Sequence, residues 1–163
     1  FMKNRETDEW LKQNQKSTRE FIRKWGHFCK HDALMKPIVP PKYDIGICIQ
    51  NCNDGLLEVL EPWCNVIYID SNIDSYIMKE SVRTSFDLKE RIKDIDSQYA
   101  SGCPHNICIE IDGNRFYETD MQVIQQISEI IQDSGDIGEF GLGNIKLIIN
   151  DLSTFEEDLI ICK

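Results

Sequence analysis

Apolar runs of strand length alternate along this chain with stretches whose apolar residues recur at helical spacing. The clearest unit has two apolar runs, at residues 44–50 and 65–70, with a short helical pattern between them. An Asn-Asp-Gly turn at 53–55 starts that helix, and Pro62 ends it. This pattern predicts a βαβ unit, in which a crossover helix joins two parallel strands.

The same alternation returns in the second half of the chain. Apolar runs at 107–112 and 145–149 predict two further strands. Between them, Ile and Val at helical spacing predict a helix over residues 120–133, with Thr119 and Gln122 as its capping box. These elements predict an α/β fold: one compact domain with a mainly parallel or mixed sheet of four to five strands.

Three other segments carry weaker patterns. Residues 82–88 favour a short strand, and the polar, charge-rich residues 89–104 favour an exposed loop. A second capping box, Ser153 with Glu156, predicts a short terminal helix.

An amphipathic helix is predicted ahead of this domain, over residues 7–25. Trp10, Phe21 and Trp25 share one of its faces, and Gly26 supplies a C-terminal stop. Buried aromatic side chains each cover roughly 150–250 Å². We therefore predict an interaction face at these three residues, which docks on this domain, on another domain or on a second copy of the chain.

A connector with three prolines separates the helix from the first predicted strand. Pro37, Pro40 and Pro41 favour extended backbone. The predicted division is therefore a helix and linker at 1–36 and an α/β domain at 37–163.

The charge balance narrows the classes of partner. The chain has 163 residues, 28 acidic against 18 basic, and a net charge of −10. A field of that sign repels phosphate backbones and anionic lipid surfaces, so we expect neither nucleic acid nor a membrane as partner. No apolar run reaches the roughly 18–20 residues of a membrane helix. With no CxxC pair among seven cysteines, we expect free thiols and a cytoplasmic location.

Polar residues follow each predicted strand, and they are the candidate site. Carboxyl ends of parallel strands line one edge of a sheet, where ligands bind. Carboxylates there could hold a divalent cation, although helix capping also explains them. We expect no resident metal or other cofactor. The residues of this acidic edge are Asp54, Asp70, Asp112 and Asp151.

Two further chemistries fit single features of the chain. Cys52 precedes a predicted helix N-terminus, a position that lowers a thiol pKa and favours a nucleophile. Zinc ligands could come from two segments, which contain His27, Cys29, His31, Cys103 and His105.

The βαβ unit resembles the start of methyltransferases that use S-adenosylmethionine. That resemblance implies that Asp70, at the end of the second strand, holds the ribose hydroxyls. The family's turn is rich in glycine, whereas residues 50–55 here contain only Gly55.

The N-terminal helix carries a more particular resemblance. Its end, with Phe21, Lys24, Trp25 and Gly26 after Asn14, is similar to the helix that closes the catalytic domain of family-2-type glycosyltransferases. The chain beyond it resembles the tail of glycosyltransferase-like proteins from large viruses and phages. In that family the catalytic residues lie upstream, so the resemblance assigns no catalytic residue here.

This resemblance implies an accessory C-terminal module, for docking, assembly or acceptor binding rather than chemistry. Its partners would be an upstream catalytic domain or a second copy, in the host cytoplasm if the source is viral. The alternatives are a small methyltransferase-like enzyme and a self-associating interaction domain, so whether the chain is an enzyme stays open.

Overall fold

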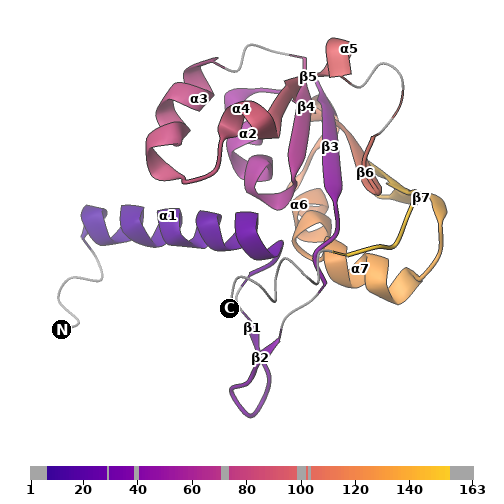
Figure 1. Ribbon diagram of the computed structural model, residues 1–163, viewed down its shortest axis with the longest axis horizontal. Coiled ribbons are helices and arrows are strands. Elements are labelled where there is room, and N and C mark those ends of the chain that lie inside the picture. The colour runs from indigo at the N-terminus through magenta and orange to yellow at the C-terminus, as the bar shows by residue number, and fades with distance from the viewer. Residues whose placement is uncertain are drawn as a thin grey trace.

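A computed structural model describes residues 7–28, 30–38, 41–70, 74–98, 102 and 104–154. It contains a six-stranded mixed sheet and a separate two-stranded hairpin, with helices around them (Figure 1). The helices are α1 (Asp8–Trp25), α2 (Asp54–Leu60), α3 (Asp74–Glu80), α4 (Leu88–Arg91), α5 (Ile95–Gln98), α6 (Glu118–Gln125) and α7 (Ile127–Ser134), with 3-10 turns η2 (Glu61–Trp63), η3 (Ser81–Arg83) and η4 (Gly113–Arg115). The strands are β1 (Lys30–His31), β2 (Pro37–Ile38), β3 (Ile45–Gln50), β4 (Val66–Ile69), β5 (Ile92–Asp94), β6 (Ile107–Asp112), β7 (Gly138–Leu142) and β8 (Ile145–Ile149).

The sheet confirms the predicted α/β class. Its strand order is β5-β4-β3-β6-β8-β7, in which β3 to β6 are parallel. The hairpin of β7 and β8 is added antiparallel to β6. The chain leaves β3 toward β4 on one side and returns to β6 on the other. The boundary between β3 and β6 is therefore a topological switch point, where ligands bind in open α/β sheets.

The hydrophobic core lies on one face of the sheet. Alternate residues of each strand, such as Ile47 and Ile49 of β3 and Ile109 of β6, are fully buried against Leu57 of α2 and Ile124 of α6. The other face carries Cys48, Tyr68 and Glu110, which lie outside that core cluster. A strand exposes opposite faces in alternation, so one face of β3 and β6 packs under helices and the other carries polar chemistry.

The segment at 82–104 differs from its prediction. Instead of a strand at 82–88 and a loop beyond, the described residues form η3, α4, β5 and α5. β5 pairs in parallel with β4, and Ile92 is buried. Arg91 is buried too, because its guanidinium donates to the carboxylate and the backbone of Glu61. That partner lies thirty residues earlier, so local polarity could not predict it.

Two boundaries in the second half also differ. The predicted helix at 120–133 is split into α6 and α7 at Gln126, and α6 begins earlier than predicted. Its capping carboxylate is Asp120, which accepts the Tyr117 N–H (3.0 Å), so Thr119 is not the cap. The glycine-rich 138–142 forms β7, which raises the strand count to six. The helix predicted from Ser153 and Glu156 lies mostly outside the described residues.

The cysteine prediction is wrong at one position. Cys48, Cys52 and Cys64 are free thiols, but Cys108 is disulfide-bonded. The bond removes the ground for inferring a reducing compartment from the cysteines. Among the described residues, no helix is long and apolar enough to cross a membrane.

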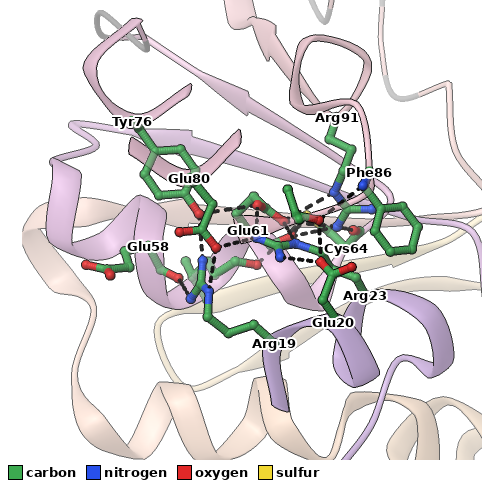
Figure 2. Close-up of polar contacts among 12 residues, drawn as sticks. Arg19, Glu20, Arg23, Glu58, Glu61, Cys64, Tyr76, Glu80, Phe86 and Arg91 are labelled. Carbon is green, nitrogen blue, oxygen red and sulfur yellow. Dashed lines mark hydrogen bonds and ion pairs between the residues drawn. The ribbon is translucent and has the colours of Figure 1, made fainter. Parts of the chain in front are cut away.

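Helix α1 begins and ends where predicted. The Thr7 hydroxyl accepts the Trp10 N–H (3.3 Å), and Gly26 ends the helix in the left-handed region, with φ 80°. The helix docks beside η2, at the amino end of β4, through a buried network of ion pairs (Figure 2). The network has three arginines and three glutamates and is therefore neutral: Arg19, Arg23, Arg91, Glu20, Glu61 and Glu80.

The network is centred on two groups that water does not reach. The Arg23 guanidinium donates to both oxygens of Glu61 (3.0 and 2.6 Å) and to Glu80 (2.8 Å), and the Arg23 and Glu61 side chains are 0% exposed. Arg19 adds bonds to Glu80 and to the Tyr76 hydroxyl. A buried pair of this kind costs desolvation but is strongly destabilising to break, because one charge is then left uncompensated.

Acid is expected to weaken this docking through Glu80. Burial tends to raise the Glu80 pKa, but hydrogen bonds from Arg23 and Arg19 outweigh it and leave the pKa lowered. A carboxyl whose pKa is lower in the folded state contributes stability above its unfolded pKa, about 4.3, and loses it as the pH falls through the folded value.

We therefore expect urea unfolding to show stability falling steadily from about pH 5 to pH 3. Glu80→Gln should be less stable at pH 7 and should flatten this pH dependence. Glu58→Gln, at an exposed pair with Lys79, should keep the wild-type slope. If stability fell with pH equally in the wild type and in Glu80→Gln, the titration of Glu80 would not be the cause of the pH dependence.

Candidate functional site

A crevice of about 560 Å³ opens at the carboxyl ends of the parallel strands. Its walls come from β3 and β6, from Asp70 just after β4, and from α5, which Figure 1 shows beside the ends of these strands, away from α1. It lies at the switch point between β3 and β6, as expected for a ligand site in this class of sheet. Nine residues line it: Cys48, Gln50, Asn51, Asp70, Ile95, Asp96, Glu110, Ile111 and Asp112.

One residue ties the two sides of the crevice together. Asn51 has φ 57°, in the left-handed region that asparagine tolerates better than most residues. Its backbone N–H donates to Asp70 (2.8 Å), and its side-chain amide donates to Asp112 (3.1 Å). The Cys52 N–H also donates to Asp70 (3.2 Å). The β3–α2 turn is therefore clamped between the acids that follow β4 and end β6.

A close approach of backbones reinforces the clamp. Gly113 follows β6 directly, and a Cβ atom there would lie 2.2 Å from the Asn51 carbonyl oxygen. No side chain fits that gap, so this turn position admits only glycine. The base of the crevice is thus fixed by backbone contact as well as by hydrogen bonds.

The four predicted acids of the edge do not all meet. Asp70 and Asp112 both line the crevice and share Asn51. Asp54 begins α2, is exposed and does not line the crevice. Asp151 follows β8, which is antiparallel to β6, so it lies at the opposite edge, where its N–H donates to Asn106 ahead of β6.

Asp112 is held in its charged form. Hydrogen bonds from the Asn114 N–H and the Asn51 amide lower its pKa, and Arg115 adds to the effect. Glu110 and Asp96 are crevice acids that the strand-end rule missed. Glu110 interrupts an otherwise apolar strand, and such a charge within an ICIEID run indicates a position that is not fully buried.

The surroundings of the two crevice cysteines do not support the cysteine nucleophile hypothesis. Burial, together with Asp70 and Asp54, raises the pKa of the Cys52 thiol to about 12. Burial with Glu110 and Asp70 does the same for Cys48. The thiolate is the nucleophile, so neither thiol is activated at neutral pH.

The zinc hypothesis gains no geometric support. Of its five residues, Cys29, Cys103 and the His31 side chain lie outside what the structure describes. His105 is engaged by Asp44 (2.9 Å) and by the Tyr68 hydroxyl (2.7 Å). No group of three or more His, Cys, Asp or Glu side chains among the described residues is arranged to hold a metal ion.

The predicted interaction face is set apart from the crevice. Trp10, Phe21 and Trp25 all lie on α1, beside the amino end of β4, whereas the crevice is at the carboxyl ends. Phe21 contacts Trp25 (6.2 Å between ring centroids) and His27 (5.7 Å). The molecule therefore has two separate candidate surfaces.

In comparisons with known proteins, no protein-family model, curated protein or solved structure matches this chain. The function is therefore inferred from the sequence and the structure.

Proposed function

We propose that this chain is a binding module whose crevice takes a neutral or cationic ligand rich in hydroxyl groups. In the context of its resemblance to glycosyltransferase tails, that ligand is the acceptor saccharide of an attached or partner glycosyltransferase. The module thus serves acceptor binding rather than chemistry.

The charge of the crevice carries this proposal. Four of its nine lining residues are acids, two carry side-chain amides, and none is lysine or arginine. Carboxylates accept hydrogen bonds from hydroxyl and ammonium groups, and charge-assisted bonds of this kind contribute roughly 1.5–3 kcal/mol each. The diphosphate of a nucleotide-sugar donor is negatively charged, so the acids of the crevice would repel it.

The expected result is binding of saccharides without binding of nucleotides. Calorimetric titration with neutral oligosaccharides, amino sugars and polyols should give saturable heat, and nucleoside diphosphates, with or without Mn²⁺, should give none. Asp96 is the best site to perturb, because among the described interactions only its backbone N–H is hydrogen-bonded. Asp96→Ala should weaken saccharide binding by roughly 10- to 150-fold, the loss of one charge-assisted bond.

Asp54→Ala is the matched control, because Asp54 is exposed and outside the crevice. It should bind like the wild type. Nucleotide binding, or no heat from any hydroxyl-rich ligand, would contradict the proposal.

S-adenosylmethionine is a second candidate ligand, favoured by one observation. Asp70 follows β4 and lines a crevice whose negative charge suits a sulfonium cation. Both Asp70 oxygens already accept backbone N–H groups, from Asn51 and Cys52, but each retains a further lone pair. Binding of S-adenosylmethionine that Asp70→Ala abolishes, without any saccharide binding, would favour this candidate over the first.

A further inference from the structure

Helix α1 docks on the domain through its charged face. On its apolar face Trp10 is exposed, and Phe21 and Trp25 are half-buried. At about 100° per residue, Trp10, Phe21 and Trp25 fall on one side of the helix, and Arg19 and Arg23 fall on the other. Ile22 is the α1 residue in the hydrophobic core, and neither Phe21 nor Trp25 packs against that core. This is the reverse of the usual arrangement, in which the apolar stripe of a surface helix faces the core.

The first part of the helix is its most exposed part. Every residue from Thr7 to Thr18 is exposed, including Trp10 (39%) and Leu11 (44%). Figure 1 shows this end of α1 extending past the strands and helices of the domain. Exposed apolar side chains that continue into a half-buried aromatic face are typical of an interaction surface.

A cavity lies on the same face, further along the helix. It measures about 200 Å³ and is lined by Ser17, Thr18, Phe21 and Phe28. Phe28 is fixed by an edge-on contact with Trp63 of η2 (4.9 Å between centroids). The face therefore offers both a protruding aromatic side chain, Trp10, and an aromatic-walled cavity.

The charges of α1 select the orientation of its partner. Its first turn is acidic, with Asp8 and Glu9 exposed, and its last turn is basic, with Lys24 half-buried. A second copy of the same helix matches this pattern only when the two run antiparallel, so that each acidic turn meets a basic one. Antiparallel alignment also opposes the two helix dipoles favourably.

From these features we infer that two copies of the chain associate through antiparallel α1 helices, each Trp10 entering the cavity beside Phe21 of the other copy. Trp10 and Phe21 are separated by roughly 16 Å along the helix. A two-fold axis near the middle of that interval, between Gln15 and Lys16, lets both Trp10 side chains reach the cavity of the other copy at once. The interface is then isologous and closes as a dimer.

The dimer is expected to be weak. An 18-residue helix is about 27 Å long, and its one face is smaller than the roughly 800 Å² per partner of a standard interface. We therefore expect a dissociation constant between roughly 1 and 500 μM. The crevice stays open in this dimer, so failure of the association test and failure of ligand binding are separate results.

Sedimentation velocity over about 1–500 μM is the test. The wild type should move from monomer to dimer within this range, and Trp10→Glu should remain monomeric. The matched control is Ile137→Glu, which adds the same charge at an apolar residue 66% exposed between α7 and β7. That variant should dimerise like the wild type.

Circular dichroism should show that Trp10→Glu keeps the wild-type fold, since Trp10 packs on nothing in the core. A wild type that is monomeric throughout the range would overturn the inference. So would a Trp10→Glu variant that still dimerises, because another surface would then be responsible.

Discussion

Replacing Glu61 by glutamine is expected to lower the free energy of unfolding by about 3–5 kcal/mol, the cost of breaking a buried ion pair from one side. Glu61 accepts from Arg23, from Arg91 and from the Tyr76 hydroxyl (3.2 Å). Its side chain is fully buried. Glutamine keeps the size but removes the charge, so two arginines lose the carboxylate that neutralises them.

Thermal and urea unfolding measure this effect. For a chain of this length a loss of 3–5 kcal/mol corresponds to a fall in Tm of roughly 6–20 °C. Glu58→Gln is the control, because Glu58 lies three residues earlier and its pair with Lys79 is exposed (3.7 Å). Exposed pairs contribute about 0–1 kcal/mol. If the two variants were equally stable, the network would not be what holds α1 on the domain.

The ion network also marks the limit of what the sequence could predict. Hydrophobic periodicity predicts β3, β4, β6 and β8 because each is a mostly apolar run of strand length, with no more than one charged residue in its interior. It cannot predict that Arg23 and Arg91 are buried, because a buried arginine depends on Glu61, a partner distant in sequence. Glu61 also reverses the docking of α1. Together with Glu80, it draws the arginine face of α1 toward the domain and leaves the aromatic face outside the core.

The geometry of the crevice, too, could be predicted from the sequence only in part. Parallel strands bring their carboxyl ends together, so the approach of Asp70 and Asp112 followed from the strand pattern. The position of Asp151 at the opposite edge could not be predicted, because the direction of a strand is set by its pairing and not by its composition. β8 joins the sheet in a hairpin with β7. The sequence did not predict β7, because its glycines interrupt the apolar pattern.

Substituting Gly113 by alanine is expected to have the second largest effect, a loss of roughly 1–3 kcal/mol, typical of an atom forced into a packed site. The new Cβ atom would lie 2.2 Å from the Asn51 carbonyl oxygen and 3.1 Å from that of Gln50. Both neighbours are backbone atoms, which cannot rotate away. The backbone of Gly113 is outside the left-handed region, so the cost comes from the close approach alone.

The same substitution should also disable the crevice. Relief of the clash requires Asn51 to move, and Asn51 is the residue that joins Asp70 to Asp112. Saccharide binding should therefore fall further in Gly113→Ala than in Asp96→Ala, in which the clamp is intact. Gly141→Ala is the control, since nothing lies within 4 Å of its added Cβ. Urea unfolding and calorimetric titration of both variants give the answer. Equal stability and equal binding in the two would show that the turns after β3 and β6 do not form the base of a ligand site.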